Sequence, residues 1–323
     1  MTNESYRAMA KAISNNPRIT LRQEGKQMEN EPLVYIDGEF HAKSKARISV
    51  FDHGLLYGDG VFEGIRAYNG SVFKLKEHID RLFQSAHAMM LEIPLTREQA
   101  IEVVLETLRK NEMKNAYIRL VVTRGVGDLG LDPRKCPRAT VICITGAITL
   151  HGDEAKLKGI STLISWVRRQ AVDATSHEIK SLNYLNSVMA KIEANMAGAD
   201  EAVSLDKNGF VAEGVGENIF IVKNGKLITP PACAGALHGI TAQVVTKLAG
   251  KLGFQVEEAN ITPFMLLNAD EAFFSGTAAE LVPIREVNKR TIGEGKPGPV
   301  TKKLLAEFQK VVADPKNGVR IYP

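Results

Sequence analysis

The chain has 323 residues, enough for about two domains that each bury a core, which excludes a peptide hormone or a disulfide-stapled mini-protein. Apolar residues make up 44% of the chain and charged residues 24%, values typical of a folded protein and not of a disordered one. The net charge of +4 is spread along the chain without a basic block, so charge gives no support to binding of nucleic acid or of a membrane surface.

The cysteines also limit the possibilities. Cys136, Cys143 and Cys233 form no CxxC pair and are odd in number, which argues against a disulfide framework or a zinc knuckle. A reducing, cytoplasmic environment fits them best. No apolar run approaches the roughly 18 to 20 residues that a membrane helix needs. Residues 1–30 lack the apolar stretch of a signal peptide, and we interpret them as an extension ahead of the first strand.

Strand and helix patterns alternate along the chain, which predicts a mixed α and β fold. Residues 77–91 carry apolar side chains at helical spacing. A capping box of Thr96 and Gln99 predicts the start of a second helix. Strands are expected at 116–124 and 139–146. The apolar stripe of the first helix consists of Ile79, Leu82, Phe83, Ala86 and Met90.

Residues 148–158 are polar and contain glycine, and we interpret them as a linker. This linker divides the chain into a smaller α/β domain over 31–147 and a larger domain over 159–323. In the larger domain, 160–167 is expected to be a strand and 182–197 a helix that ends at a glycine.

The second half of the larger domain has the turn signals of a β-rich segment. Residues 206–209 and 224–225 are typical of hairpin turns. A short apolar strand is expected at 271–275. Helices are expected at 241–252 and 299–312.

A glycine-rich segment at 125–130 matches the G-x-G-x-x-G pattern of dinucleotide-binding proteins. That site requires a helix to begin at the third glycine, with its N-terminus facing the pyrophosphate. Pro133 and Pro137 follow almost at once and do not allow such a helix. We therefore interpret the segment as a flexible loop.

Two pairs of residues could carry chemistry. Tyr117 and Arg119 lie two apart on a strand, so both side chains leave the same face and could hold an anion, although a solvated arginine is the simpler alternative. Lys180 comes just before the helix expected at 182–197, with Tyr184 one turn further on. A helix dipole there favours the neutral amine that imine chemistry needs, whereas a single lysine is usually a solvated surface group.

Other candidates are weaker when taken singly. The segments 239–241 and 275–278 combine glycine with threonine where a helix begins or a strand ends, which suits a phosphate but is also ordinary turn chemistry. Arg81 lies opposite the apolar stripe of its helix, where simple solvation explains it. Glu213 could equally be a surface residue. The histidines show no metal-binding spacing, so no metal site is predicted.

Taken together, seven ordered segments resemble the branched-chain-amino-acid aminotransferases of the class IV pyridoxal-phosphate-dependent family, from about Val34 to Phe308. The resemblance implies a two-domain D-amino-acid-aminotransferase-like fold of type IV and a homodimer or larger homo-oligomer. The segments are DHGLLYGDGVFEGIRAYNG (52–70), EHIDRL (77–82), AYIRLVVTRG (116–125), EIKSLNYLNSVMAKIEA (178–194), EGVGENIF (213–220), GIT (239–241) and SGTAAELVPI (275–284).

The resemblance assigns roles around the cofactor, pyridoxal 5'-phosphate. It implies that Lys180 forms the internal aldimine and then acts as the general base between the substrate α carbon and C4′ of the cofactor. Glu213 is implied to pair with the pyridine nitrogen, and Tyr184 to bind the phenolic oxygen. The residues implied to hold the phosphate are Arg81, Ile240, Thr241 and Thr277.

Substrate contacts follow from the same resemblance. Arg119 and Tyr57 are implied to bind the distal carboxylate of glutamate, with Tyr57 coming from the neighbouring subunit, and Phe62 to form an apolar wall. The loop at 125–135 would cover the substrate. The residues implied to bind the α-carboxylate are Tyr117 and the backbone of Thr277 and Ala278.

The predicted reaction is therefore reversible transfer of an amino group from leucine, isoleucine or valine to 2-oxoglutarate. The alternatives are a D-amino-acid or (R)-amine transaminase of the same fold, and a cofactor-carrying regulatory protein without turnover. The chain departs from the family pattern at His238, at Ala242 and in the length of residues 1–30.

Overall fold

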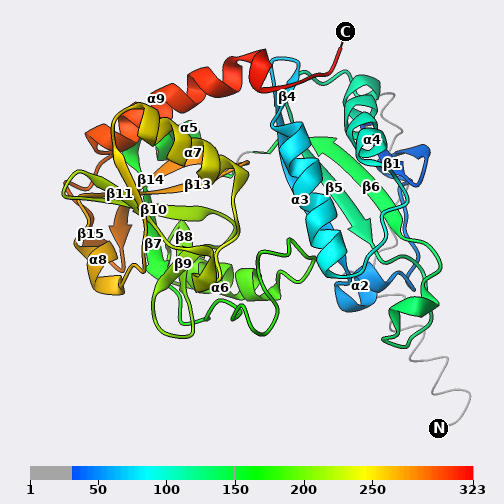
Figure 1. Cartoon of the computed structure of the whole chain (residues 1–323), viewed down its shortest axis with the longest axis horizontal. Helices are drawn as coiled ribbons and strands as arrows, with labels where there is room; N and C mark the ends of the chain where they lie inside the picture. The colour runs from blue at the N-terminus through cyan, green and yellow to red at the C-terminus, as the bar shows by residue number, and fades with distance from the viewer. Residues whose placement is uncertain (1–30, 149, 323) are drawn as a thin grey trace, which may run out of the picture. The chain divides into compact units, whose positions relative to one another are not determined.

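The computed structural model describes residues 31–148 and 150–322 (Figure 1). The extension predicted over residues 1–30 lies outside this range. From Pro32 onward the chain forms one compact unit that contains two sheets, which confirms the mixed α and β class. The predicted division of this unit into two domains stays a prediction.

The first sheet joins seven of the described strands, and each neighbouring pair is antiparallel. Its strands are β1 (Leu33–Ile36), β2 (Glu39–Ala42), β3 (Gly60–Tyr68), β4 (Ser71–Phe73), β5 (Ala116–Thr123), β6 (Thr140–Gly146) and β16 (Gly318–Arg320). They lie in the order β16-β4-β3-β5-β6-β1-β2. The edge next to β4 is thus formed by residues from the far end of the chain.

Helices α3 (Leu75–Ala88) and α4 (Arg97–Lys110) contact each other and pack on β3 and β6, respectively (Figure 1). The predicted capping box of α4 is confirmed, because Thr96 and Gln99 exchange both hydrogen bonds. Most of the predicted stripe of α3 is buried. The placement of Met90 on that stripe is wrong: α3 ends before it, and Met90 is 90% exposed with a φ of +51°.

The second sheet contains nine of the described strands. They are β7 (Ile160–Ile164), β8 (Glu201–Leu205), β9 (Val211–Gly214), β10 (Asn218–Lys223), β11 (Lys226–Thr229), β12 (Gln255–Glu258), β13 (Glu271–Gly276), β14 (Glu280–Val287) and β15 (Arg290–Thr291). The main order is β12-β11-β10-β13-β14-β7-β8-β9, and β15 pairs with β14. Both predicted hairpins are confirmed by the antiparallel pairs β8–β9 and β10–β11.

Helices cover this second sheet. Helices α7 (Ile240–Lys251) and α9 (Pro299–Ala313) contact each other and β13, α6 (Leu185–Met196) packs on β8, and α5 (Asp153–Lys158) packs on β14 (Figure 1). Helix α5 occupies part of the segment that the sequence indicated as a linker. The α-helices of this region are α5 (Asp153–Lys158), α6 (Leu185–Met196), α7 (Ile240–Lys251), α8 (Pro263–Leu267) and α9 (Pro299–Ala313).

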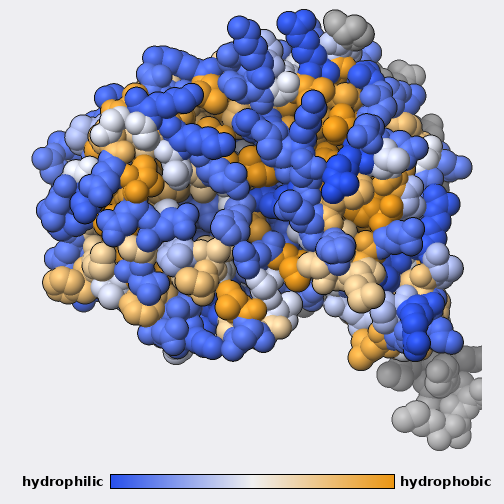
Figure 2. Space-filling view, viewed as in Figure 1, coloured by the Kyte–Doolittle hydropathy of each residue, from blue (hydrophilic) through white to orange (hydrophobic). Residues whose placement is uncertain are grey.

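The face of the molecule seen in Figure 2 is mostly hydrophilic, with apolar side chains in separate groups between the polar ones. In the part of the chain that the structure describes, no helix combines the length and the apolar character needed to cross a bilayer.

Candidate active site

A cavity of about 410 Å³ is lined by residues from both sheets, a size typical of small-molecule sites. Strands β3 and β5 supply one side of it, and the segments around Lys180, the start of α7 and the end of β13 supply the other. The structure therefore brings together most of the residues that the sequence indicated. Those that line the cavity are Phe62, Arg81, Tyr117, Arg119, Lys180, Tyr184, Ile240, Thr241, Thr277 and Ala278.

Lys180 is fixed by its own backbone. Its carbonyl oxygen accepts a 3.0 Å hydrogen bond from the N–H of Phe62, and the N–H of Leu182 donates to the oxygen of Gly60 at 2.9 Å. The segment thus runs along β3 like a short additional strand. The side-chain nitrogen donates to the hydroxyl of Tyr184 at 3.1 Å and lies 4.6 Å from the centroid of the Phe62 ring.

The prediction that Lys180 stands at a helix entrance is wrong. Helix α6 begins at Leu185, with Tyr184 as its N-cap residue, so Lys180 lies more than one turn before the first helical residue. The favourable end of a helix dipole acts within the first turn only. The surroundings of this amine are therefore set by Phe62 and Tyr184, and not by the helix.

Arg81 is held by a buried carboxylate. Its Nε and Nη2 donate to Glu63 at 2.6 and 2.8 Å, and its Nη1 donates to the backbone oxygen of His238 at 2.9 Å. Burial alone would raise the pKa of Glu63, but the charges of Arg81 and His78 lower it to about 2. Simple solvation is thus wrong for Arg81, whose side chain is only 12% exposed.

Glu213 is buried at the end of β9, which overturns the surface alternative. Its Oε1 lies 3.2 Å from Arg169 and 3.0 Å from Nε2 of His177, and its Oε2 accepts a 2.9 Å hydrogen bond from the N–H of Leu237. Burial raises the pKa of Glu213, but the charges of Arg169 and His177 outweigh it and lower the pKa overall. The carboxylate is therefore ionised. It does not itself line the cavity, whereas Leu237 does.

The backbone of the turn after β13 is fixed by Arg66. Its Nη1 donates to the oxygen of Ala278 at 2.9 Å and lies 3.3 Å from the carboxylate of Glu280. Glu280 is buried and has a φ of +62°, a strained value for a residue with a side chain. Three further groups donate to this carboxylate: the Tyr68 hydroxyl at 3.0 Å, Lys156 at 2.6 Å and Gln309 at 2.7 Å.

Helix α7 presents its first turn to the cavity through Ile240 and Thr241. Its N-cap residue, Gly239, has no side chain to occupy the free N–H groups of that turn. A Cβ atom on Gly239 would stand 1.8 Å from Oδ1 of Asn218, so any side chain there would displace Asn218. Free N–H groups at a helix start are a natural binding site for an anion.

Tyr117 and Arg119 occupy one face of β5, as their spacing predicted, while Ile118 between them is fully buried. Nη2 of Arg119 donates to the hydroxyl of Tyr117 at 3.0 Å, and the guanidinium carbon lies 4.5 Å from the centroid of the Phe62 ring. A Cβ atom on Gly64 would lie 2.2 Å from the Tyr117 hydroxyl, so the glycine makes room for this pair.

Tyr57 is not brought to the cavity. It ends the short helix α2 (His53–Tyr57), and its hydroxyl donates to the backbone oxygen of Leu129. Leu129 lies in the glycine-rich loop, where it is 69% exposed. A role for Tyr57 in the site of a neighbouring subunit stays a prediction.

Sequence reasoning missed the partners that orient the site. Glu63 lies in the middle of a buried strand, where a charged residue is rare unless it is paired, and this was the available signal. Arg169 and His177 gave no comparable signal.

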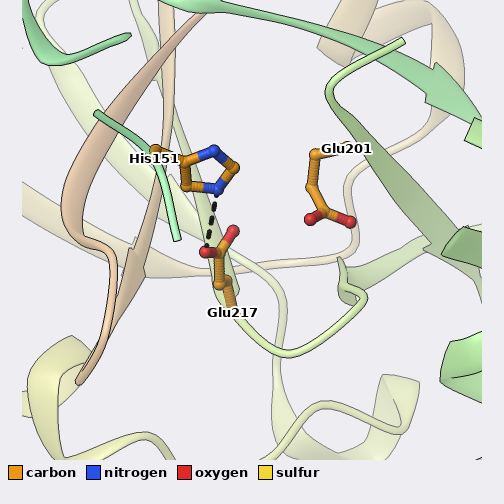
Figure 3. A group of neighbouring side chains, drawn as sticks. All are labelled: His151, Glu201 and Glu217. Carbon is orange, nitrogen blue, oxygen red and sulfur yellow. Dashed lines mark hydrogen bonds and ion pairs between the residues drawn. The ribbon is translucent and has the colours of Figure 1, made fainter. Parts of the chain in front are cut away.

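His151, Glu201 and Glu217 also come together, with one possible ligand atom from each within 4.8 Å of the others (Figure 3).

The residues present fit a phosphorylated aromatic aldehyde. A primary amine, free N–H groups of a helix start and an arginine are grouped at one cavity, and an ionised carboxylate lies beneath its wall. Two buried acceptor atoms of the wall, Oγ of Ser275 and Oε2 of Glu217, have no hydrogen-bond partner among the described residues. Buried polar groups rarely stay unsatisfied, so this wall has polar groups available to a ligand or to a bound water.

The family model described as amino-transferase class IV matches residues 60–287. The chain is a class IV aminotransferase. It is 55% identical over 290 residues to a protein of Methanocaldococcus jannaschii whose name assigns it provisionally as a branched-chain-amino-acid aminotransferase; the match covers 90% of this chain and 99% of that one.

Solved structures agree with this assignment. The Escherichia coli branched-chain amino acid aminotransferase has a TM-score of 0.85 and 37% identity, over 87% of this aminotransferase and 94% of that chain. The branched-chain amino acid aminotransferase from Thermobaculum terrenum, solved in its PLP-form, has a TM-score of 0.80 and 30% identity, over 90% of this aminotransferase and 97% of that chain. The predicted family and the type IV fold are confirmed.

Proposed function

We infer that this aminotransferase transfers amino groups reversibly between the branched-chain amino acids leucine, isoleucine or valine and 2-oxoglutarate, with pyridoxal phosphate as cofactor. The observation that carries this inference is the amine of Lys180, which lies in a cavity with an apolar wall and a guanidinium on the same side. The names of the relatives support the same substrates.

The residues that would hold the cofactor surround Lys180. Arg81, Thr277 and the first turn of α7 at Ile240 and Thr241 would bind the phosphate through charge and N–H groups. Glu213 would keep a proton on the ring nitrogen, and the Tyr184 hydroxyl would bind the phenolic oxygen. When bound, pyridoxal phosphate supplies a carbonyl that reacts with amines and a ring that withdraws electrons from the substrate α carbon.

Lys180 has a second task, which is to move a proton. Its amine nitrogen lies against the Phe62 ring and donates to the hydroxyl of Tyr184, and these two contacts orient it. An amine held in this way would accept the proton of the substrate α carbon and deliver it to C4′ of the cofactor. The T-shaped contact of Phe62 with Tyr184, at 5.0 Å between centroids, closes this side of the cavity.

The two kinds of substrate place opposite demands on the remaining space. Tyr117 and the backbone of Thr277 and Ala278 would take the α-carboxylate that all substrates share. Arg119 would bind the distal carboxylate of glutamate, joined by Tyr57 of a neighbouring subunit. The apolar side of the cavity would take the branched side chains; its members are Phe62, Leu150, Leu182, Val215 and Leu237.

A direct assay tests this function. The purified holoenzyme is mixed with L-leucine and 2-oxoglutarate, and glutamate formation is followed, with D-alanine as the competing donor. We expect faster turnover of L-leucine. A preference for D-alanine would favour a D-amino-acid transaminase, and a cofactor spectrum unchanged by every amine would indicate a regulatory protein. Borohydride reduction followed by peptide mapping should label Lys180. A homodimer and a cytoplasmic location belong to the same proposal, and light scattering measures the former.

A further inference from the structure

Two neighbouring residues ahead of α5, Leu150 and His151, differ sharply in their surroundings. Leu150 lines the cavity and is 45% exposed, whereas the side chain of its neighbour His151 is only 7% exposed. An apolar residue at the mouth of the cavity is thus followed directly by a residue anchored inside the protein.

The anchor of His151 is Glu217. Nε2 of His151 lies 3.3 Å from Oε1 of Glu217, whose side chain is 4% exposed (Figure 3). The other oxygen, Oε2, has no hydrogen-bond partner among the described residues. The third residue of the group, Glu201, already has a cation, because Lys191 lies 3.2 Å from it. His151 therefore supplies the counter-charge for Glu217.

The state of the imidazole agrees with this pairing. Burial lowers the pKa of His151, but the hydrogen bond and charge of Glu217, together with the charge of Glu201, outweigh burial and the opposing charge of Lys191 and raise the pKa overall. Removing one partner of a buried ion pair leaves the other partner uncompensated, which is strongly destabilising. Breaking the contact between His151 and Glu217 is therefore energetically unfavourable.

Glu217 belongs to the wall of the cavity itself. It lines the cavity next to Gly216, and its Cγ lies 3.3 Å from the place where a Cβ atom on Gly276 would stand. Gly276 directly precedes Thr277. The contact between His151 and Glu217 thus joins the segment that carries Leu150 to the wall beside the residues expected to bind substrate and cofactor.

We propose that His151 is a positioning residue that, through Glu217, holds Leu150 at the cavity and so sets the affinity for substrates with an apolar side chain. The proposal rests on the proposed function, because it concerns the choice among that reaction's substrates. A divalent cation among His151, Glu201 and Glu217 is disfavoured, because the ammonium of Lys191 lies against Glu201 and would repel it.

The test compares His151→Ala, His151→Gln and Leu150→Ala in the holoenzyme, with KM and kcat measured for L-leucine and for L-glutamate. His151→Ala and Leu150→Ala should each raise the KM for leucine roughly tenfold, the effect of losing part of one apolar contact, with kcat nearly unchanged. The KM for glutamate should change less. His151→Gln keeps an N–H donor but not the positive charge, and should restore part of the affinity.

The double variant separates positioning from two independent effects. If His151 acts through Leu150, the double variant should have the same KM for leucine as either single variant, whereas independent effects would multiply. His87→Ala, on the exposed face of α3, is the matched control and should behave like the wild type.

Several results would overturn the proposal: multiplying effects in the double variant, an unchanged KM in Leu150→Ala, or equal losses for leucine and glutamate. So would a loss of leucine affinity on EDTA treatment that zinc restores, because the three side chains would then hold a cation. If His151→Ala does not fold, His151→Gln and Leu150→Ala decide the matter. Wild-type enzyme without leucine turnover would instead refute the proposed function.

Discussion

The guanidinium of Arg81 forms two hydrogen bonds with the carboxylate of Glu63, at 2.6 and 2.8 Å. Glu63 lies on β3 and Arg81 on α3, so this pair couples the sheet to the helix in front of it. The arginine is thereby already oriented for the phosphate that we propose it binds. Groups that are fixed in advance lose less entropy when a ligand binds.

Replacing Glu63 by Gln should lower both stability and cofactor affinity. The folded pKa of Glu63 is about 2 against an ordinary value of 4.5, so its ionisation stabilises the fold above pH 4.5 and that stabilisation is lost as pH falls from 4.5 to 2. The full effect is on the order of 3 kcal/mol. Urea unfolding should show a difference between wild type and Glu63→Gln at pH 7 that shrinks toward pH 3.

The control for this experiment is Asp80→Asn, which breaks an exposed ion pair with Arg97. Such pairs contribute about 0 to 1 kcal/mol, so its unfolding should match the wild type closely. An equal difference at pH 7 and pH 3 for Glu63→Gln would show that the charge of Glu63 is not the cause.

Lys180→Ala should abolish transamination while leaving the fold intact, because we propose that this nitrogen is both the attachment point of the cofactor and the base. The cofactor should still bind through its phosphate, but borohydride should no longer trap a covalent bond between the cofactor and the protein. Absorbance spectra and single-turnover assays measure both effects. Retained turnover in this variant would refute the role of Lys180.

Arg119→Ala should act mainly on one of the two substrates. Its guanidinium is the cation next to Tyr117 on the substrate side of the cavity, so we expect the KM for 2-oxoglutarate to rise by roughly ten- to a hundredfold, as for a lost charge-assisted hydrogen bond. The KM for leucine should change much less. Arg119→Lys, which keeps the charge, should give an intermediate value; equal effects on both substrates would contradict this role.

Arg66→Ala should weaken cofactor binding indirectly, because Arg66 acts on the turn that carries Thr277. Arg66 holds the oxygen of Ala278 and the carboxylate of Glu280, so its loss frees the turn that carries Thr277. We expect roughly tenfold faster cofactor loss on dialysis, from one lost charge-assisted hydrogen bond. Arg66→Lys, which keeps a positive charge, should retain the cofactor better than Arg66→Ala but less well than the wild type. Unchanged cofactor retention would show that the turn is rigid by itself.

Local signals predicted the elements that depend on neighbours in sequence. The capping box of Thr96 and Gln99, the turn at 224–225 and the shared face of Tyr117 and Arg119 all rest on contacts a few residues apart. The ordered motifs predicted the family. The end of α3 before Met90 was missed, because apolar spacing can continue past the point where a helix stops.

The partners that orient the site could not be predicted, since they come from distant segments. Glu63 and Arg81 are 18 positions apart, and His151 and Glu217 are 66 apart. Solvation of Arg81 was the better expectation until the fold placed a buried carboxylate beside it. The local pattern predicts a helix from residue 182, whereas pairing with β3 keeps the segment around Lys180 extended.

Strand β16 has a consequence for how the protein is made. Residues 318–320 pair with β4, and the N–H of Ile321 donates to the oxygen of Gly70 at 2.9 Å. A ribosome releases these residues long after the rest of the first sheet has emerged. Until then the nascent chain exposes an unpaired strand edge, the feature through which chains aggregate or exchange strands. Chaperone binding to this edge should therefore matter most until residues 318–320 have emerged and paired with β4.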